Sequence, residues 1–324
     1  MADFSTIKGF NVQVLSADPP GPGVGQVWYN TTTGTMKGYG QIGTGAWAAG
    51  GSMPASYYGG AYSGTQAAGI YAGGVPGPTN TSYIYNGTSW TTSPATINPA
   101  RHHTITAGCG TSTAAQLTGG ETTPYSIVGN SEQFNGTSWS EVSALTTARY
   151  TLVVGGNQTA AIGMTGYSGS VQAIVEEWNG SSWTAGTAAP QAKYYASGGG
   201  TPTSALVCAG KPAPPSRYKT SDYWNGTSWT ETSDMNTERS TAGTSTQDGT
   251  AVLVFGGEIP PRSGVTEVWD GSSWTEVADL ATPANQNSGG GTDKVGISVG
   301  NENPNNGASE EWDVPTTTKT FSSS

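Results

Sequence analysis

The chain contains two histidines, the adjacent His102 and His103 in the stretch NPARHHTIT. Histidine is a common general base and metal ligand near neutral pH. Neighbouring side chains of an extended strand point to opposite faces, so two adjacent imidazoles in a strand would not bind one metal ion together. No Ser/His/Asp order, metal-spaced cluster or phosphate-binding loop accompanies them. We therefore interpret them as polar turn residues and expect no catalytic residue, no metal and no cofactor.

Acidic residues recur at a regular interval, each two positions before an aromatic residue. An active site needs a few residues in unequal roles, so regular repetition favours a scaffold function, with a ring of ion ligands as the alternative. We expect these carboxylates to pair with recurrent basic residues or with backbone amides between repeats. The acidic residues are Glu132, Glu176, Asp222, Glu267 and Glu310, and the basic residues are Arg101, Arg149 and Arg239, with Lys193 in the same phase.

The aromatic residues belong to a repeat of about 45 residues that contains a short motif. The hexapeptide WNGTSW at 224–229 recurs as YNGTSW, FNGTSW, WNGSSW and WDGSSW, and a sixth copy, WDVPTT, keeps only the first half. Asn-Gly tolerates the positive φ that tight hairpin turns require, so each copy predicts a hairpin, which also accounts for the N-x-Ser/Thr pattern of glycosylation acceptors. In the sixth copy, Thr317 takes the place of the closing tryptophan.

Two large aromatic rings in each repeat are expected to pack between neighbouring sheets, and a platform for stacking on sugars is the alternative. The opening residues are Tyr85, Phe134, Trp178, Trp224, Trp269 and Trp312, and the closing residues are Trp90, Trp139, Trp183, Trp229 and Trp274. Trp47 lies 43 residues before the first closing residue.

Each repeat also contains an apolar run that ends in small residues, such as AAQLTGG or AVLVFGG, and has room for four short strands. One four-stranded sheet cannot bury both faces alone, and radial stacking of several sheets leaves few exposed edges. The sequence therefore predicts an all-β fold, a β-propeller of six blades over residues 51–321 followed by a short tail at 322–324. A seventh, degenerate blade formed by the N-terminal segment is the alternative.

An Arg-bearing turn, an apolar strand ending in Gly-Gly and a Tyr-to-Trp hairpin together resemble the kelch repeat, from about residue 51 to 317. This resemblance implies a kelch-like β-propeller. Residues 1–50 lack a full copy, and we expect them to form an attachment element or to help close the ring. Their pattern, in which IKGFNVQVL leads through DPPGPG to VWYNTTTGTMKGY, is similar to the N-terminal segment of structural proteins of marine bacteriophages.

The second resemblance implies a non-enzymatic virion component such as a tail fibre, tail tip or capsid decoration, assembled in the host cytoplasm in several copies per particle. Residues 1–50 would bind other virion proteins, with Trp28, Tyr29 and Tyr39 as contacts, and the propeller would contact a glycan of the host surface. A carbohydrate-binding or carbohydrate-processing propeller and a general protein-interaction module are the alternatives.

The net charge and the length of the apolar runs exclude some classes of binding partner. The formal net charge of −10 argues against nucleic acid and anionic membranes as partners, and no apolar run is long enough for membrane insertion. No secretory signal is expected at Met1–Leu15. Contact residues are expected where the repeats differ, in the loops Gly119–Asn130, Thr165–Val171, Lys211–Lys219 and Glu258–Val265.

Overall fold

The computed structural model describes residues 12–106, 108–212, 216–260, 262–302 and 305–321. Within these ranges the regular structure consists of β-strands, mostly in four-stranded antiparallel sheets, and contains no helix. Accordingly, none of the described segments is a helix long and apolar enough to cross a membrane. The first eleven residues and the expected tail at 322–324 lie outside the described residues.

The chain folds into two compact units. The larger unit spans Ala46–Asp313, and the smaller unit combines the described residues up to Gly45 with those from Val314 onward. These limits differ from the expected boundaries at 50 and 321. Residues 46–49 belong to the larger unit and residues 314–321 to the smaller one, because of the strand pairing described below.

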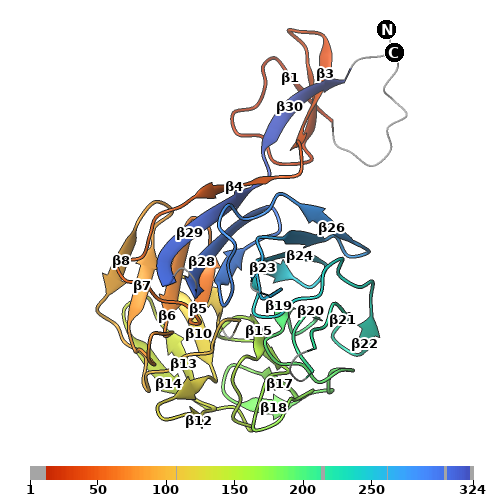
Figure 1. Cartoon of the computed structure of the whole chain (residues 1–324). Coiled ribbons are helices and arrows are strands. Elements are labelled where there is room, and N and C mark those ends of the chain that lie inside the picture. The colour runs from red at the N-terminus through yellow and green to blue at the C-terminus, as the bar shows by residue number, and fades with distance from the viewer. Residues whose placement is uncertain (1–11, 107, 213–215, 261, 303–304, 322–324) are drawn as a thin grey trace. The chain divides into compact units, whose positions relative to one another are not determined.

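Six four-stranded antiparallel sheets make up the described part of the larger unit (Figure 1). The first three contain β5 (Ala61–Thr65), β6 (Ala68–Ala72), β7 (Ser82–Tyr85) and β8 (Trp90–Ser93); β9 (Gly108–Thr111), β10 (Ala114–Thr118), β13 (Ser131–Phe134) and β14 (Trp139–Val142); and β15 (Val153–Gly156), β16 (Ala161–Met164), β17 (Val175–Trp178) and β18 (Trp183–Ala185). The next three contain β19 (Ser197–Thr201), β20 (Ser204–Cys208), β21 (Ser221–Trp224) and β22 (Trp229–Glu231); β23 (Gly243–Asp248), β24 (Ala251–Phe255), β25 (Thr266–Trp269) and β26 (Trp274–Val277); and β27 (Ser288–Gly291), β28 (Val295–Glu302), β29 (Asn305–Asp313) and β4 (Ala46–Ala49). A separate hairpin, β11 (Glu121–Thr122) and β12 (Ser126–Ile127), extends from the second sheet.

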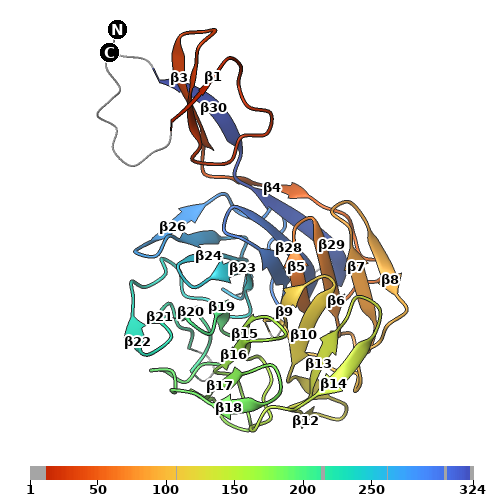
Figure 2. The same ribbon diagram turned by 180° about the vertical axis from the view of Figure 1, so that it is seen from behind.

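The first strands of the sheets lie toward the middle of this unit, as β5, β15, β19 and β23 show from both sides (Figures 1 and 2) and β9 shows in Figure 2. Each of these strands contacts the next along the chain, and β27 contacts β5. The approach is close enough to require glycine, since a Cβ on Gly155 would lie 2.5 Å from the carbonyl oxygen of Gly200. This arrangement of sheets around a centre is β-propeller-like.

The last strand of the sixth sheet comes from the beginning of the larger unit. Strand β4 pairs with β29, which places Trp47 opposite Trp312. The expectation that Thr317 stands in the closing position is therefore wrong. Thr317 lies in β30 (Thr316–Phe321), where it pairs with Gly40.

The smaller unit is a four-stranded sheet in the order β1 (Gln13–Leu15), β2 (Val27–Asn30), β3 (Thr35–Gln41) and β30. Its buried side chains include Trp28 and Met36. The carboxylate of Asp18 accepts hydrogen bonds from Trp28, Asn30 and Lys37 at 2.7–3.0 Å. These bonds, that from Lys37 above all, lower the pKa of Asp18 to about 2.

Candidate functional site

The predicted aromatic pairs are part of the scaffold. Each of the six four-stranded sheets of the larger unit has one pair across its last two strands, and the ring centroids lie between 4.8 Å for Tyr85–Trp90 and 5.6 Å for Trp178–Trp183. Several closing tryptophans donate their indole N–H to the preceding sheet: Trp139 to Ser82, Trp183 to Ser131 and Trp274 to Ser221. These rings are thus held between sheets by both packing and hydrogen bonds.

The recurrent charges form buried ion pairs. Each joins the connection before a sheet to the third strand of that sheet, at 2.5 Å for Arg101–Glu132, 2.7 Å for Arg149–Glu176 and 2.9 Å for Lys193–Asp222, with Arg239–Glu267 in the same place. Burial lowers the pKa of the three arginines. In the sixth sheet Glu310 instead accepts the amides of Ala281 and Thr282. This regularity assigns these residues to the frame of the larger unit.

The expected attachment residues lie in the smaller unit, but none of them is an exposed side chain. Trp28 is fully buried, and Tyr29 and Tyr39 are half-buried, with the Tyr39 hydroxyl bonded to Thr316. The expectation for Trp28 is wrong, because the ring packs inside the sheet and its indole N–H is used by Asp18. Among the residues of this unit that the structure describes, the large apolar side chains that are exposed are Val14, Val24 and Phe321.

A ring of equivalent positions precedes the inner strands of the larger unit. At each position the backbone is left-handed, with φ between 52° and 67°. Backbone hydrogen bonds link several of them from sheet to sheet, as from Gly59 to Gln286 and from Gln286 to Thr241. The backbone conformation thus repeats from sheet to sheet while the side chains differ. The six residues are Gly59, His103, Thr151, Tyr195, Thr241 and Gln286.

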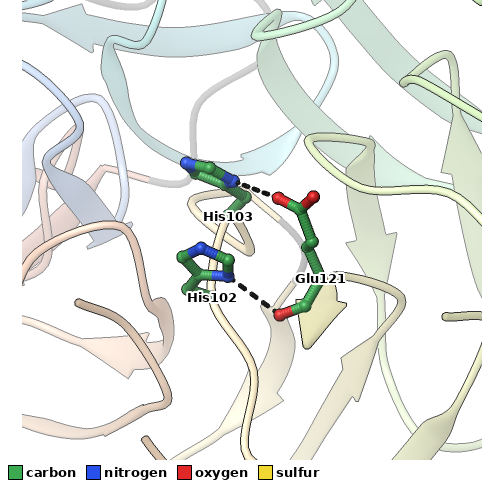
Figure 3. Close-up of side chains that lie close together, drawn as sticks. All are labelled: His102, His103 and Glu121. Atoms are coloured by element: carbon green, nitrogen blue, oxygen red, sulfur yellow. Dashed lines mark hydrogen bonds and ion pairs between the residues drawn. The ribbon is translucent and has the colours of Figure 1, made fainter. Parts of the chain in front are cut away.

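The two histidines face the same way, contrary to the expectation from strand geometry. The φ of His103 is +54°, so the pair is not extended, and the two imidazoles stack with centroids 4.2 Å apart. Both Nδ1 atoms face Glu121 (Figure 3): that of His102 lies 2.8 Å from the backbone oxygen and that of His103 2.9 Å from Oε2. His102 and Glu121 are buried and His103 is half-buried.

The surroundings of His103 favour its neutral imidazole. Burial, and then the neighbouring His102, lower the pKa of His103, and the carboxylate of Glu121 only partly opposes them. The backbone oxygen of Glu121 can only accept, so the Nδ1 of His102 carries the proton of that hydrogen bond. The His103 ring is therefore suited to donate a nitrogen lone pair at neutral pH.

Tyrosines surround the histidines. The ring of Tyr150 stacks on His103 at 5.5 Å, and Tyr195 meets His103 edge-on at 5.8 Å. Tyr167 and Tyr194 extend the cluster, with centroids 5.6 Å apart. Burial raises the pKa of Tyr150 to about 12 and raises that of Tyr195 as well, so these phenols remain neutral hydrogen-bonding groups.

Charged residues lie next to Tyr195 of this cluster. Lys211 lies 5.7 Å above the ring of Tyr195 and 2.5 Å from the carboxylate of Glu258, which Arg217 also contacts at 2.6 Å. Burial would raise the pKa of Glu258, but the hydrogen bonds and charges of Lys211 and Arg217 outweigh it and lower the pKa. The result is a partly buried surface of imidazole, phenol and paired charges.

The loops that differ between repeats are brought together in this surface. Each expected loop provides a member: Glu121, Tyr167, Lys211 with Arg217, and Glu258. Positions 213–215 and 261 of these loops lie outside the described residues. The sequence reasoning missed the His and Tyr positions that the loops surround. The two residues after each recurrent basic residue could have indicated these positions, because they differ between successive repeats and read HH, YT, YY and ST.

A separate cavity of 290 Å³ lies between the inner strands, lined mostly by their later residues. Gly64, Gly110, Gly156, Gly200 and Gly291 are among them. Glycine provides only backbone groups there, and the lining residues that the structure describes include no histidine and no charged side chain.

Comparison with known proteins agrees with this architecture. No family model and no curated protein sequence matches the chain. A solved structure of YjhT aligns with a TM-score of 0.66 over 83% of this chain and 99% of YjhT, at 11% sequence identity. The two proteins share a fold, and at this identity the likeness extends to nothing else.

Proposed function

We propose that the chain is a non-enzymatic structural protein of a bacteriophage virion, a six-bladed kelch-like propeller displayed on a tail fibre, tail tip or capsid surface. Six successive four-stranded sheets, and the contacts that run from β5 through to β27 and back to β5, support the blade count. The resemblance of the N-terminal segment to marine phage proteins supports the virion assignment.

The observation that carries the proposal is the set of chain segments that form the smaller unit. Its strands come from the segment before the propeller and from the segment after it. In the sequence, the propeller is therefore inserted between two parts of one small sheet. Val14 and Phe321 of that sheet, and Val24 in the turn before β2, are exposed at 69%, 52% and 62%. Exposed apolar side chains on so small a unit suit contact with another protein of the particle.

The particle itself provides the direct test. Virions are purified from a culture infected with the virus that encodes the chain. Their proteins are identified by mass spectrometry, and the copy number of the chain is measured against that of the major capsid protein. We expect the chain in the particle at a fixed copy number. Its absence from intact particles would overturn the proposal.

Incorporation can then be tied to the smaller unit. A variant with Val14→Ser, Val24→Ser and Phe321→Ser should fold and fail to incorporate. Tyr125→Ser is the matched control, because Tyr125 is an exposed aromatic residue of the larger unit, 83% accessible. It should incorporate normally, and equal loss in both variants would argue against attachment through the smaller unit.

Carbohydrate binding is the second candidate function, favoured by the tyrosine cluster around His103. Aromatic faces beside hydroxyl and charged groups suit sugar rings. A glycan array with the purified chain tests it, with Tyr150→Ala and Tyr195→Ala as site variants and Tyr29→Ala in the smaller unit as the control. Hydrolase assays on the same glycans separate binding from processing, and capture of a protein without any glycan signal would favour a general interaction module.

A further inference from the structure

We propose that His102, His103 and Glu121 form a binding site for one divalent transition-metal ion, with two imidazole nitrogens and one carboxylate oxygen as protein ligands. This inference goes beyond the proposed virion function and does not depend on it. The site lies between the segment that precedes β9 and the hairpin of β11 and β12, where both imidazole rings face Glu121 (Figure 3).

The spacing of the donor atoms fits an ion of this class. One ligand atom from each of the three residues lies within 4.8 Å of the others. A zinc ion with ligands at about 2.0–2.2 Å needs donor atoms about 3.3–3.6 Å apart, which small side-chain rotations supply. The hydrogen bond between His103 Nδ1 and Glu121 Oε2, now 2.9 Å, would be replaced by two bonds to the ion.

The backbone holds these residues in place. His102 and Glu121 exchange two backbone hydrogen bonds of 3.0 Å, and the left-handed conformation of His103 brings its ring beside that of His102. Glu121 belongs to the hairpin of β11 and β12, which fixes its side of the site. The ligands therefore come from two segments whose relative position is already set, which lowers the cost of binding an ion.

Other sheets have the same backbone bridge with different side chains. The equivalent pairs are Tyr150 with Tyr167, Tyr194 with Lys211, and Ser240 with Glu258. Among these bridges, only that of His102 with Glu121 combines adjacent imidazoles with a carboxylate. The metal-binding chemistry is thus a property of its side chains, and the remaining bridges provide internal controls.

The ligand set selects a class of metal. Two imidazole nitrogens with one carboxylate oxygen suit Zn²⁺, Co²⁺, Ni²⁺ or Cu²⁺, whereas Mg²⁺ and Ca²⁺ favour oxygen ligands. The cysteines do not compete, because burial raises the pKa of both Cys109 and Cys208 to about 12 and keeps the thiols protonated.

The test uses the full chain, freed of metal with a chelator and titrated with Zn²⁺ by calorimetry and with Co²⁺ by visible absorption. We expect one ion per chain and a rise in the melting temperature with Zn²⁺ concentration. His102→Gln, His103→Gln and Glu121→Gln should each lower the affinity by about 100-fold. Glu258→Gln is the matched control from an equivalent bridge and should bind Zn²⁺ as the unaltered chain does.

Three results would overturn the site: no saturable Zn²⁺ binding, Zn²⁺ binding that survives in the His102→Gln/His103→Gln double variant, or equally strong binding of Mg²⁺. Because the variants can fail to fold, a measurement on the unaltered chain stands beside them. The chain has only two histidines, so imidazole NMR signals report on this site alone. Both should shift with one equivalent of Zn²⁺, and unchanged signals would refute the proposal.

Discussion

Trp47 and Trp312 face each other across the last strand pair of the sixth sheet, with ring centroids 5.5 Å apart. Trp47 also meets Phe255 edge-on at 4.9 Å and donates its indole N–H to Thr266 in the fifth sheet. It therefore repeats the role of the closing tryptophans in the other sheets. The residue that the sixth repeat lacks is provided from the other end of the larger unit.

Replacing Trp47 should destabilise the larger unit. Trp47→Ala removes a half-buried ring and its hydrogen bond, so we expect a loss of about 2–4 kcal/mol in the free energy of unfolding. Urea denaturation followed by tryptophan fluorescence measures it. Trp28→Ala, which alters the smaller unit, is the control and should leave the main unfolding transition in place.

Truncation should separate the two units at residues 46 and 313. A chain of residues 46–313 retains every strand of the six sheets and should unfold cooperatively. A chain of residues 51–313 lacks β4 and leaves the edge of β29 unpaired, so it should aggregate or melt at a clearly lower temperature. Circular dichroism and size-exclusion chromatography distinguish them, and equal stability would show that β4 is dispensable.

The buried pair of Arg149 and Glu176 should be sensitive to loss of one partner. Arg149→Ala leaves a buried carboxylate without its cation and should cost about 3–5 kcal/mol, whereas Arg149→Met with Glu176→Leu should cost much less. The exposed pair of Lys219 and Asp234, at 3.4 Å, is the control, and its alanine variants should change stability by less than about 1 kcal/mol. Chemical denaturation provides the comparison.

Acid should loosen the smaller unit through Asp18. Its pKa falls from 3.8 to about 2 in the folded chain, so its contribution is fully present above about pH 4 and is lost as the pH falls through about 2. The indole N–H signal of Trp28, which donates to Asp18, should report this loss by NMR. Asp18→Asn retains an acceptor without the charge, so that signal should no longer depend on pH in this window.

Much of the frame follows from the sequence, because each copy of the motif dictates the same local chemistry. Asn225 accepts the amides of Thr227 and Ser228, and Gly226 has a φ of +90°, as a tight turn after Trp224 requires. Repetition likewise identified the scaffold carboxylates. The strand pairing of Trp47 was not predictable in this way, because no local pattern links it to a partner so distant in the chain.

The candidate site was predictable only in part. Unequal loops indicated where Glu121 and Tyr167 would lie, but the relation between His102 and His103 depends on a left-handed residue in a region that alternation rules treat as extended. Neither histidine nor tyrosine requires that conformation by itself. The six-fold recurrence of the conformation at otherwise dissimilar residues shows that the frame imposes it.

Synthesis order gives the pairing of β4 with β29 a further meaning. The ribosome releases Ala46–Ala49 early, but their hydrogen-bonding partner in β29 emerges only after five other sheets have been made. Until then β4 lacks its partner strand, and the contact between β27 and β5 cannot form before β27 has been made. Completion of this protein is thus a late event in translation, decided by whether one short strand near the beginning of the chain is still free when the last one arrives.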